Sequence, residues 1–77
     1  PHGFYQDYKT ELQERCQEGN GALPIYHLIS EAGPAHQKQF EIEVRIGGIA
    51  YGVGRGKNKK AAQQQAAAIA LGKLASA

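Results

Sequence analysis

The stretch QFEIEVRIGGIAYGV, residues 39–53, decides the fold class of this chain. Residues 39–46 alternate between apolar and polar side chains, which is typical of a strand with one buried face and one solvent-exposed face. The apolar set is Phe40, Ile42, Val44 and Ile46, and the charged set is Glu41, Glu43 and Arg45. Gly47-Gly48 then predicts a tight hairpin, and residues 49–53 predict the antiparallel strand that follows it.

The sequence before this hairpin predicts one more strand and one helix. Residues 24–31 favour a strand with Tyr26 and Leu28 on one face. Further upstream, an apolar stripe at four-residue spacing predicts a helix that starts after Asp7, a good N-cap residue, and ends at Gly-Asn-Gly, residues 19–21. The stripe consists of Tyr8, Leu12 and Cys16.

The sequence after the hairpin predicts a loop and then a long second helix. Gly52, Gly54 and Gly56 favour an irregular loop, and Asn58 is the expected N-cap of the helix. The expected buried face of this helix is narrow and rich in alanine, so the helix axis can lie close to a sheet. This face comprises Ala62, Ala66, Ala67, Ala70, Leu71 and Leu74. We therefore predict an α+β fold in the order α-β-β-β-α, with a three-stranded antiparallel sheet and both helices packed on one face.

Length and composition restrict the class of protein. The 77 residues suffice for one small domain, which we place at residues 7–75, between a flexible lead-in or linker remnant at 1–6 and a tail at 76–77. A single cysteine, Cys16, excludes an internal disulfide, and its place on the apolar stripe predicts a buried thiol. The chain has no apolar run of about 20 residues and no signal-peptide pattern, so we expect a cytoplasmic protein without a membrane partner.

The net charge of +2 hides an asymmetry along the chain. Residues 1–44 carry seven acidic and three basic side chains, whereas residues 45–77 carry six basic and no acidic ones. Four of these six cations fall within residues 55–60, which run into the second helix. This distribution favours a polyanionic partner for the basic half, although a solvated charged loop explains the charge alone equally well.

The basic segment of residues 54–60 is the strongest functional candidate. Lysines on the first turn of a helix oppose the macrodipole, while the free N–H groups there attract anions, so an external phosphate would relieve the arrangement. The alternative is that the lysines are only solvated. Two nucleotide-binding loops are excluded, because Asn58 stands where a Walker loop needs serine or threonine and Lys57 stands where a dinucleotide fingerprint needs glycine.

Two polar surfaces are further candidates. The solvent-facing side of the first helix can exchange hydrogen bonds with ribose hydroxyls and base edges in a shallow minor groove. It carries Thr10, Gln13, Glu14 and Gln17. The turn at residues 33–36, Gly-Pro-Ala-His, can place a polar tip in a groove. Taken alone, each surface is better explained by solvation than by a function. Paired carboxylates, a nucleophile elbow and zinc spacing are lacking, so we predict no catalytic or metal site.

Three ordered motifs resemble the double-stranded-RNA-binding domain and, within it, the C-terminal domain of bacterial ribonuclease III. Residues 7–14, DYKTELQE, are similar to the first-helix signature of that enzyme family. Residues 33–40 match the pattern G-P-x-H-x-x-x-F. Residues 54–71 match the pattern G-x-G-x-S-K-K-x-A-x-x-x-A-A-x-x-A-L, with Asn58 in place of the serine. Asparagine caps a helix as well as serine does, but it removes one hydroxyl contact to phosphate.

The resemblance implies a domain that binds double-stranded RNA by its shape and spans about 16 base pairs. The first helix would contact one minor groove through Thr10, Gln13 and Glu14. The turn with Pro34 and His36 would enter the next minor groove. The start of the second helix would bridge the major groove between them at its phosphates. The residues of that bridge are Lys57, Asn58, Lys59 and Lys60.

The resemblance also implies a longer parent protein, a double-strand-specific endoribonuclease of the ribonuclease III type. Its separate nuclease domain would use Mg²⁺ and form the homodimer, so the present residues would carry neither a catalytic site nor a cofactor. The alternative for the domain is a protein–protein interaction module of the same fold that has lost RNA binding. The lysines before the second helix and His36 argue against that alternative.

Overall fold

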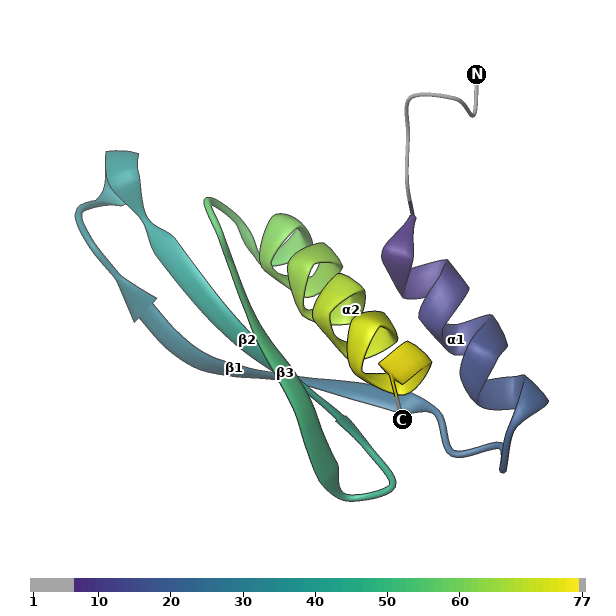
Figure 1. Cartoon of the computed structure of the whole chain (residues 1–77). Coiled ribbons are helices and arrows are strands. Elements are labelled where there is room, and N and C mark those ends of the chain that lie inside the picture. Colours follow the sequence, from purple (N-terminus) through teal and green to yellow (C-terminus); the bar gives the residue numbers. More distant parts are fainter. Residues whose placement is uncertain (1–6, 77) are drawn as a thin grey trace.

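A computed structural model of the chain describes residues 7–76 (Figure 1). It confirms the predicted order of elements, whose bounds are α1 Tyr8–Glu18, β1 Pro24–Ala32, β2 Gln39–Ile46, β3 Ile49–Gly56 and α2 Lys59–Ser76. A short 3-10 helix, η1 (Ala35–Gln37), lies in the β1–β2 connection. The predicted lead-in at residues 1–6 and residue 77 of the predicted tail lie outside the described residues.

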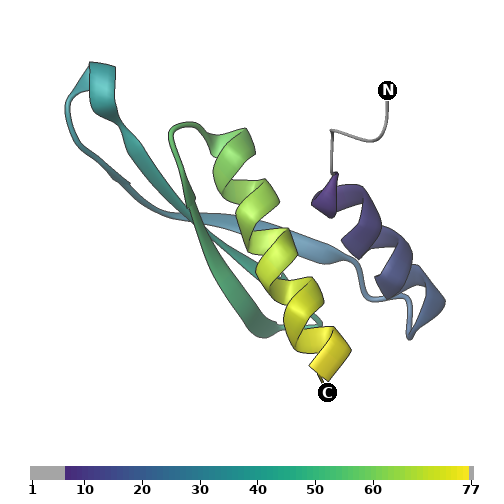
Figure 2. The ribbon, with the colours of Figure 1, turned by 45° about the horizontal axis from the view of Figure 1, so that its top comes forward.

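The sheet is antiparallel with strand order β1-β2-β3, and both helices cover the same face of it (Figures 1 and 2). The predicted hairpin turns at Gly47 and Gly48, whose φ angles of 61° and 80° are those that a type I′ turn requires. α2 lies across β2 and β3, whereas α1 packs mainly against α2 and touches the sheet only lightly, at β1. The sheet therefore determines the position of α2 far more than that of α1.

The hydrophobic core is small and lies between the two helices and the central strand. Its buried residues are Leu12, Cys16, Ile42, Val44, Ala62, Ala66, Ala67 and Ala70. The alanines confirm the predicted face of α2, on which Leu71 and Leu74 are partly buried. Cys16 is a free thiol, 6% exposed, and burial raises its pKa, in agreement with the predicted structural role.

The prediction of a loop at Gly52, Gly54 and Gly56 is wrong, because β3 continues to Gly56. These glycines face α2, and a Cβ at Gly52 would lie 2.6 Å from Cγ2 of Ile69. A Cβ at Gly54 would overlap the backbone of Ala62 and Ala66. The glycines are therefore in the strand because the helix backbone approaches it so closely, and not because the chain bends there.

The first strand is longer and less buried than the sequence suggests. It runs one residue further, to Ala32, and a bulge between Leu28 and Ser30 interrupts its register with β2. Tyr26 and Leu28 do share a face, since they pair with Val44 and Ile42, yet Leu28 is 45% exposed. β1 is an edge strand, and α1 reaches only its beginning (Figure 1), so most of its inner face stays uncovered.

Candidate nucleic-acid interface

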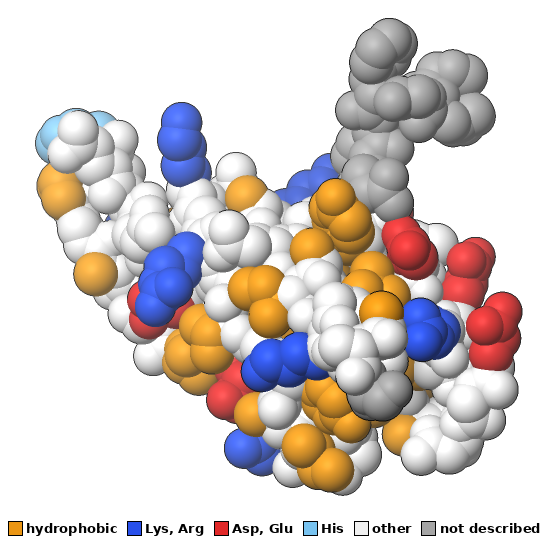
Figure 3. All heavy atoms as spheres, viewed as in Figure 1, with side chains coloured by type: hydrophobic (Ala, Val, Ile, Leu, Met, Phe, Trp, Pro, Cys, Tyr) orange, Lys and Arg blue, Asp and Glu red, His pale blue; other side chains and the backbone are white. Residues whose placement is uncertain are grey.

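Three segments that are distant in the sequence lie along one edge of the molecule. They are the β1–β2 connection at one end, the start of α2 in the middle and the start of α1 at the other end (Figures 1 and 2). Figure 3 shows blue lysine and arginine side chains on this edge, between the pale-blue histidine surface of the β1–β2 connection and α1. The fold thus places in one row the three surfaces whose order along a duplex the family resemblance implies.

The start of α2 presents exposed lysines around a capped helix end. The Asn58 side chain accepts a hydrogen bond from the Ala61 backbone N–H at 2.8 Å, which confirms the predicted N-cap. Lys57, Lys59 and Lys60 are exposed. Within residues 7–76, none of the three lies within ion-pair distance of a carboxylate, although the charge of Lys59 adds to the lowering of the Glu31 pKa by Lys38. These ammonium groups are therefore available to an external anion.

Arg55 belongs to the same basic stretch of sequence but points elsewhere. Its guanidinium pairs with Glu41, and Arg45 pairs with Glu43 at 2.9 Å, on the sheet face that the helices leave uncovered. These partly exposed pairs contribute little to stability. They do neutralise the outer sheet face, so the uncompensated positive charge is concentrated at the start of α2.

The start of α1 is capped and tied to α2 by the same carboxylate. Asp7 accepts from the Thr10 backbone N–H at 3.2 Å and from the Thr10 hydroxyl at 2.8 Å, which confirms the predicted N-cap. Hydrogen bonds from Gln64 and Thr10 hold the pKa of the Asp7 carboxyl below its ordinary value of 3.8. The predicted contact residues all lie on the exposed side of α1, opposite the buried Leu12 and Cys16. They are Thr10, Gln13 and Glu14, and Gln17 is exposed on the same side.

The β1–β2 connection is a compact, tethered turn. Gly33 has φ +94° and faces the Gln37 carbonyl so closely that no side chain fits there, and the Pro34 carbonyl accepts from the Gln37 N–H at 2.8 Å. An ion pair between Glu31 and Lys38 closes the base of the connection and lowers the pKa of Glu31. The turn therefore presents His36, which is exposed, from a fixed backbone.

A pocket joins this turn to the start of α2. It is lined by the 3-10 helix, by Lys38 and Gln39 that follow it, and by Lys57, so that His36 and Lys57 border the same space. Sequence analysis treated these two residues as contacts to different grooves. The structure places both on the lining of one pocket, so the turn and the start of α2 adjoin there.

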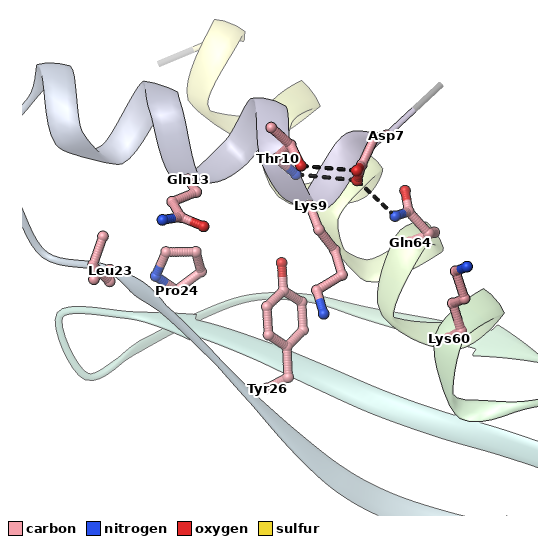
Figure 4. Close-up of a pocket in the computed structure, with 9 residues that line it drawn as sticks. All are labelled: Asp7, Lys9, Thr10, Gln13, Leu23, Pro24, Tyr26, Lys60 and Gln64. Atoms are coloured by element: carbon pink, nitrogen blue, oxygen red, sulfur yellow. Dashed lines mark hydrogen bonds between the residues drawn. The ribbon is translucent and has the colours of Figure 1, made fainter. Parts of the chain in front are cut away.

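A second, larger pocket of about 670 Å³ lies between the start of α1, the beginning of β1 and α2 (Figure 4). Lys9 lies here with its ammonium group 5.0 Å from the ring centroid of Tyr26, and it donates to the Gln63 side-chain oxygen at 2.6 Å. Among residues 7–76 the buried Tyr26 hydroxyl has no hydrogen-bond partner, and burial raises the pKa of Tyr26 to about 12.

The sequence analysis did not predict this pocket. It placed Lys9 in the first-helix signature and Tyr26 on a strand face, but no motif or periodicity links these two residues to Gln63 and Gln64. Their proximity depends on how α1 packs beside α2, which is a tertiary feature. A glutamine run on the polar side of a helix is the only local signal.

The residues present do not form a site for the Mg²⁺ that the family resemblance implies for a nuclease. The described part of the chain has no cluster of three or more histidine, cysteine, aspartate or glutamate side chains that could hold a metal ion. Its carboxylates are distributed over α1, the base of the turn and the outer sheet face, where several are engaged with cations. Separately, neither of the described helices is long and apolar enough to cross a membrane.

Comparison with known sequences agrees with this arrangement. The family model of the double-stranded RNA binding motif matches residues 8–74. The chain is 47% identical over 71 residues to Ribonuclease 3 of Caldanaerobacter subterraneus subsp. tengcongensis, covering 92% of this chain and 31% of that protein. It is 51% identical over 69 residues to Ribonuclease 3 of Latilactobacillus sakei, covering 88% and 30% respectively. The chain thus spans about a third of the length of these relatives.

Solved structures show the same fold. A chain of Arabidopsis HYL1 superposes with a TM-score of 0.78 at 36% identity, covering 91% of this chain and 99% of that one. Dicer from Pichia stipitis has a TM-score of 0.68 at 26% identity, covering 91% of this chain and 35% of that one. Together with the capped helices, the tethered turn and the row of three surfaces, these matches show that the chain belongs to the double-stranded RNA binding motif family.

Proposed function

We propose that this domain binds double-stranded RNA by contacting a minor groove, the adjacent major groove and the next minor groove along one side of the duplex. The observation that carries the proposal is the order of the three surfaces along one edge (Figures 1 and 2). A neutral and acidic helix face and a turn with an exposed histidine flank a central group of unpaired lysines. Minor grooves offer hydroxyls and base edges, and the major groove of an A-form duplex offers phosphates.

The start of α2 supplies the electrostatic part of binding. Lys57, Lys59 and Lys60 neutralise phosphates across the major groove and release counterions, and the free N–H groups of the helix end add a positive potential. Asn58 holds the helix end in place through its cap and approaches the same phosphates.

The two flanking surfaces supply the recognition of shape. Thr10, Gln13 and Glu14 contact ribose 2′-hydroxyls and base edges of one minor groove. These contacts distinguish RNA from DNA, whereas lysine contacts to phosphates do not. Pro34 and His36 enter the next minor groove from the tethered turn. Because the fold fixes the spacing between the surfaces, an A-form duplex fits all three, while a B-form duplex meets only some of them.

We further propose that the domain is the RNA-binding part of a ribonuclease III chain that works in the cytoplasm. The curated relatives are named Ribonuclease 3, and the present residues cover about a third of their length. Cleavage, the requirement for Mg²⁺ and the homodimer would then belong to the nuclease domain outside the present residues. The domain on its own binds the duplex without cleaving it.

Titration with matched RNA and DNA duplexes of about 20 base pairs, at several salt concentrations, tests the binding mode. Preferential binding to RNA that weakens with salt is the expected result. Equal affinity for both duplexes would reduce the site to a phosphate-binding patch. Absence of RNA binding would overturn the proposal in favour of a protein-interaction module, and Mg²⁺-dependent cleavage by this chain would contradict the assignment of catalysis to another domain.

A further inference from the structure

The start of α1 is attached to α2 by a small set of hydrogen bonds that the motifs of the sequence do not include. The side-chain oxygen of Gln64 accepts from the Tyr8 backbone N–H at 2.7 Å. Its amide nitrogen donates to Asp7 at 2.9 Å, a bond that Figure 4 shows. One glutamine of α2 therefore holds both the first backbone N–H of α1 and the carboxylate that caps it. This attachment matters because the sheet supports α1 only lightly.

The Asp7 carboxylate also determines whether the Thr10 hydroxyl, on the exposed side of α1, donates or accepts a hydrogen bond. Thr10 Oγ1 lies 2.8 Å from Asp7 Oδ2, and an ionised carboxylate only accepts hydrogen bonds, so the Thr10 hydroxyl must donate its single hydrogen to Asp7. Its lone pairs remain for an external donor. A ribose 2′-hydroxyl can donate to them, whereas deoxyribose has no hydroxyl at that position.

The neighbouring glutamines make different attachments. Gln63 accepts from Lys9 of α1, while Gln65 accepts from the Arg55 backbone N–H of β3 at 2.6 Å. Gln64 and Gln65 are thus adjacent residues of one type, each with a tertiary hydrogen bond, but only Gln64 reaches α1. Gln65 provides a matched control for any effect that comes from loosening α2.

We propose that Gln64 is a positioning residue for RNA recognition. Through Asp7 it sets where the α1 face and the Thr10 hydroxyl stand relative to the lysines at the start of α2, and so it sets the preference for an RNA duplex over a DNA duplex. Gln64 needs no contact with RNA for this role. The inference rests on the proposed function and names the residue that connects two of its three surfaces.

The variants Gln64→Ala and Gln65→Ala separate positioning from simple stabilisation. For Gln64→Ala, affinity for the RNA duplex falls about three- to tenfold, the range that corresponds to the loss of one hydrogen bond between the Thr10 hydroxyl and a ribose 2′-hydroxyl. Affinity for the DNA duplex and the salt dependence stay as in the unaltered chain, because the lysines are unchanged. Gln65→Ala leaves the ratio of RNA to DNA affinity unchanged. Equal losses on both duplexes, or the same ratio in both variants, would overturn the proposal.

The variant Gln64→Glu covers the case in which Gln64→Ala does not fold. Glutamate has nearly the same shape and can still accept from the Tyr8 N–H, but it places a second carboxylate against Asp7. We expect it to lower the RNA-to-DNA affinity ratio at neutral pH at least as much as alanine does. An unchanged ratio would show that the amide donor of Gln64 has no role in recognition.

The orientation of α1 in the free protein gives a test that does not depend on RNA. Residual dipolar couplings of backbone amides report the angle between α1 and α2, and we expect this angle to change in Gln64→Glu and Gln64→Ala but not in Gln65→Ala. An unchanged angle overturns the positioning role even if the chain binds RNA. If the unaltered chain shows no preference for RNA while the angle does change, the proposed function fails and the attachment is a structural one only.

Discussion

The two helices lie on the same sheet face, but different forces hold them there. α2 packs its alanines directly on β2 and β3, with glycines of β3 removing the side chains that would separate helix and strand. α1 buries Leu12 and Cys16 and is otherwise joined to α2 and Tyr26 by polar contacts near its start. Close backbone packing allows a single arrangement, whereas a few hydrogen bonds at one end allow small shifts.

The two helices also differ in the charges that they carry. α2 carries lysines and no acidic residue, and α1 carries Glu11, Glu14 and Glu18 on its surface. In the proposed complex the rigid helix therefore supplies the attraction to phosphate, and the lightly attached helix supplies the discrimination between duplexes. Separate changes to each helix should separate affinity from selectivity.

Removing the glycine that allows close packing of α2 should have the largest effect. In Gly54→Ala the new Cβ meets the backbone of Ala62 and Ala66, and we expect the free energy of unfolding to fall by about 3 kcal/mol. Guanidinium unfolding monitored by circular dichroism measures it. The matched control is Gly72→Ala, where a Cβ meets nothing within 4 Å, and this change should stabilise the domain by up to about 1 kcal/mol. Equal stability of both variants would contradict the packing account.

Removing two charges from α2 should weaken binding to every duplex. For Lys59→Ala combined with Lys60→Ala, we expect affinity to fall at least about tenfold and the slope of log affinity against log salt to decrease by about 1.8, for two lost phosphate contacts. Titration of RNA and DNA duplexes at several salt concentrations measures both quantities. Lys73→Ala, at the other end of α2, is the charge-matched control and should leave the slope unchanged. A slope unaffected by the double change would remove these lysines from the interface.

Removing the hydroxyl that α1 presents should reduce selectivity and leave the salt dependence unchanged. In Thr10→Val the acceptor for a 2′-hydroxyl disappears, and we expect RNA affinity to fall about three- to tenfold with DNA affinity constant. Thr10→Ser restores the hydroxyl and should recover most of the loss. If valine and serine behave alike, the Thr10 hydroxyl is not a contact.

The smallest expected effect concerns the pH dependence of stability. Because the pKa of Asp7 is lowered in the folded state, its carboxylate stabilises the fold above the ordinary value of 3.8, and this contribution is lost as pH falls through the lowered pKa. Thermal unfolding between about pH 5 and pH 2 should therefore show a smaller acid loss in Asp7→Asn, which keeps the helix cap. The pKa of Glu31 is also lowered, chiefly by its hydrogen bond from Lys38, so its contribution to stability is lost in the same direction as pH falls. Glu31→Gln therefore serves as a parallel measurement. An identical acid loss in Asp7→Asn and the unaltered chain would contradict the role of Asp7.

Most of the fold could be predicted from local sequence because local chemistry controls those elements. The alternation in β2, the left-handed glycines of the hairpin and the side-chain caps at Asp7 and Asn58 each depend on residues within a few positions of one another. The glycines of β3 were misassigned for the opposite reason. Glycine favours a loop locally, but here the backbone of Ala62 and Ala66 in α2 packs so closely on β3 that no side chain fits at Gly54.

The candidate site divides in the same way. Sequence by itself determined which side chains the domain presents to a ligand, because motif and periodicity place each of them locally. They are a group of lysines at a capped helix start, a polar helix face, and a glycine-proline turn with a histidine. The family resemblance implied the order of these surfaces along a duplex. Only the tertiary structure decided that His36 and Lys57 line one pocket and that Gln64 holds the start of α1. The physical reason is that spacing between surfaces arises from helix-on-sheet and helix-on-helix packing, which joins residues more than fifty positions apart.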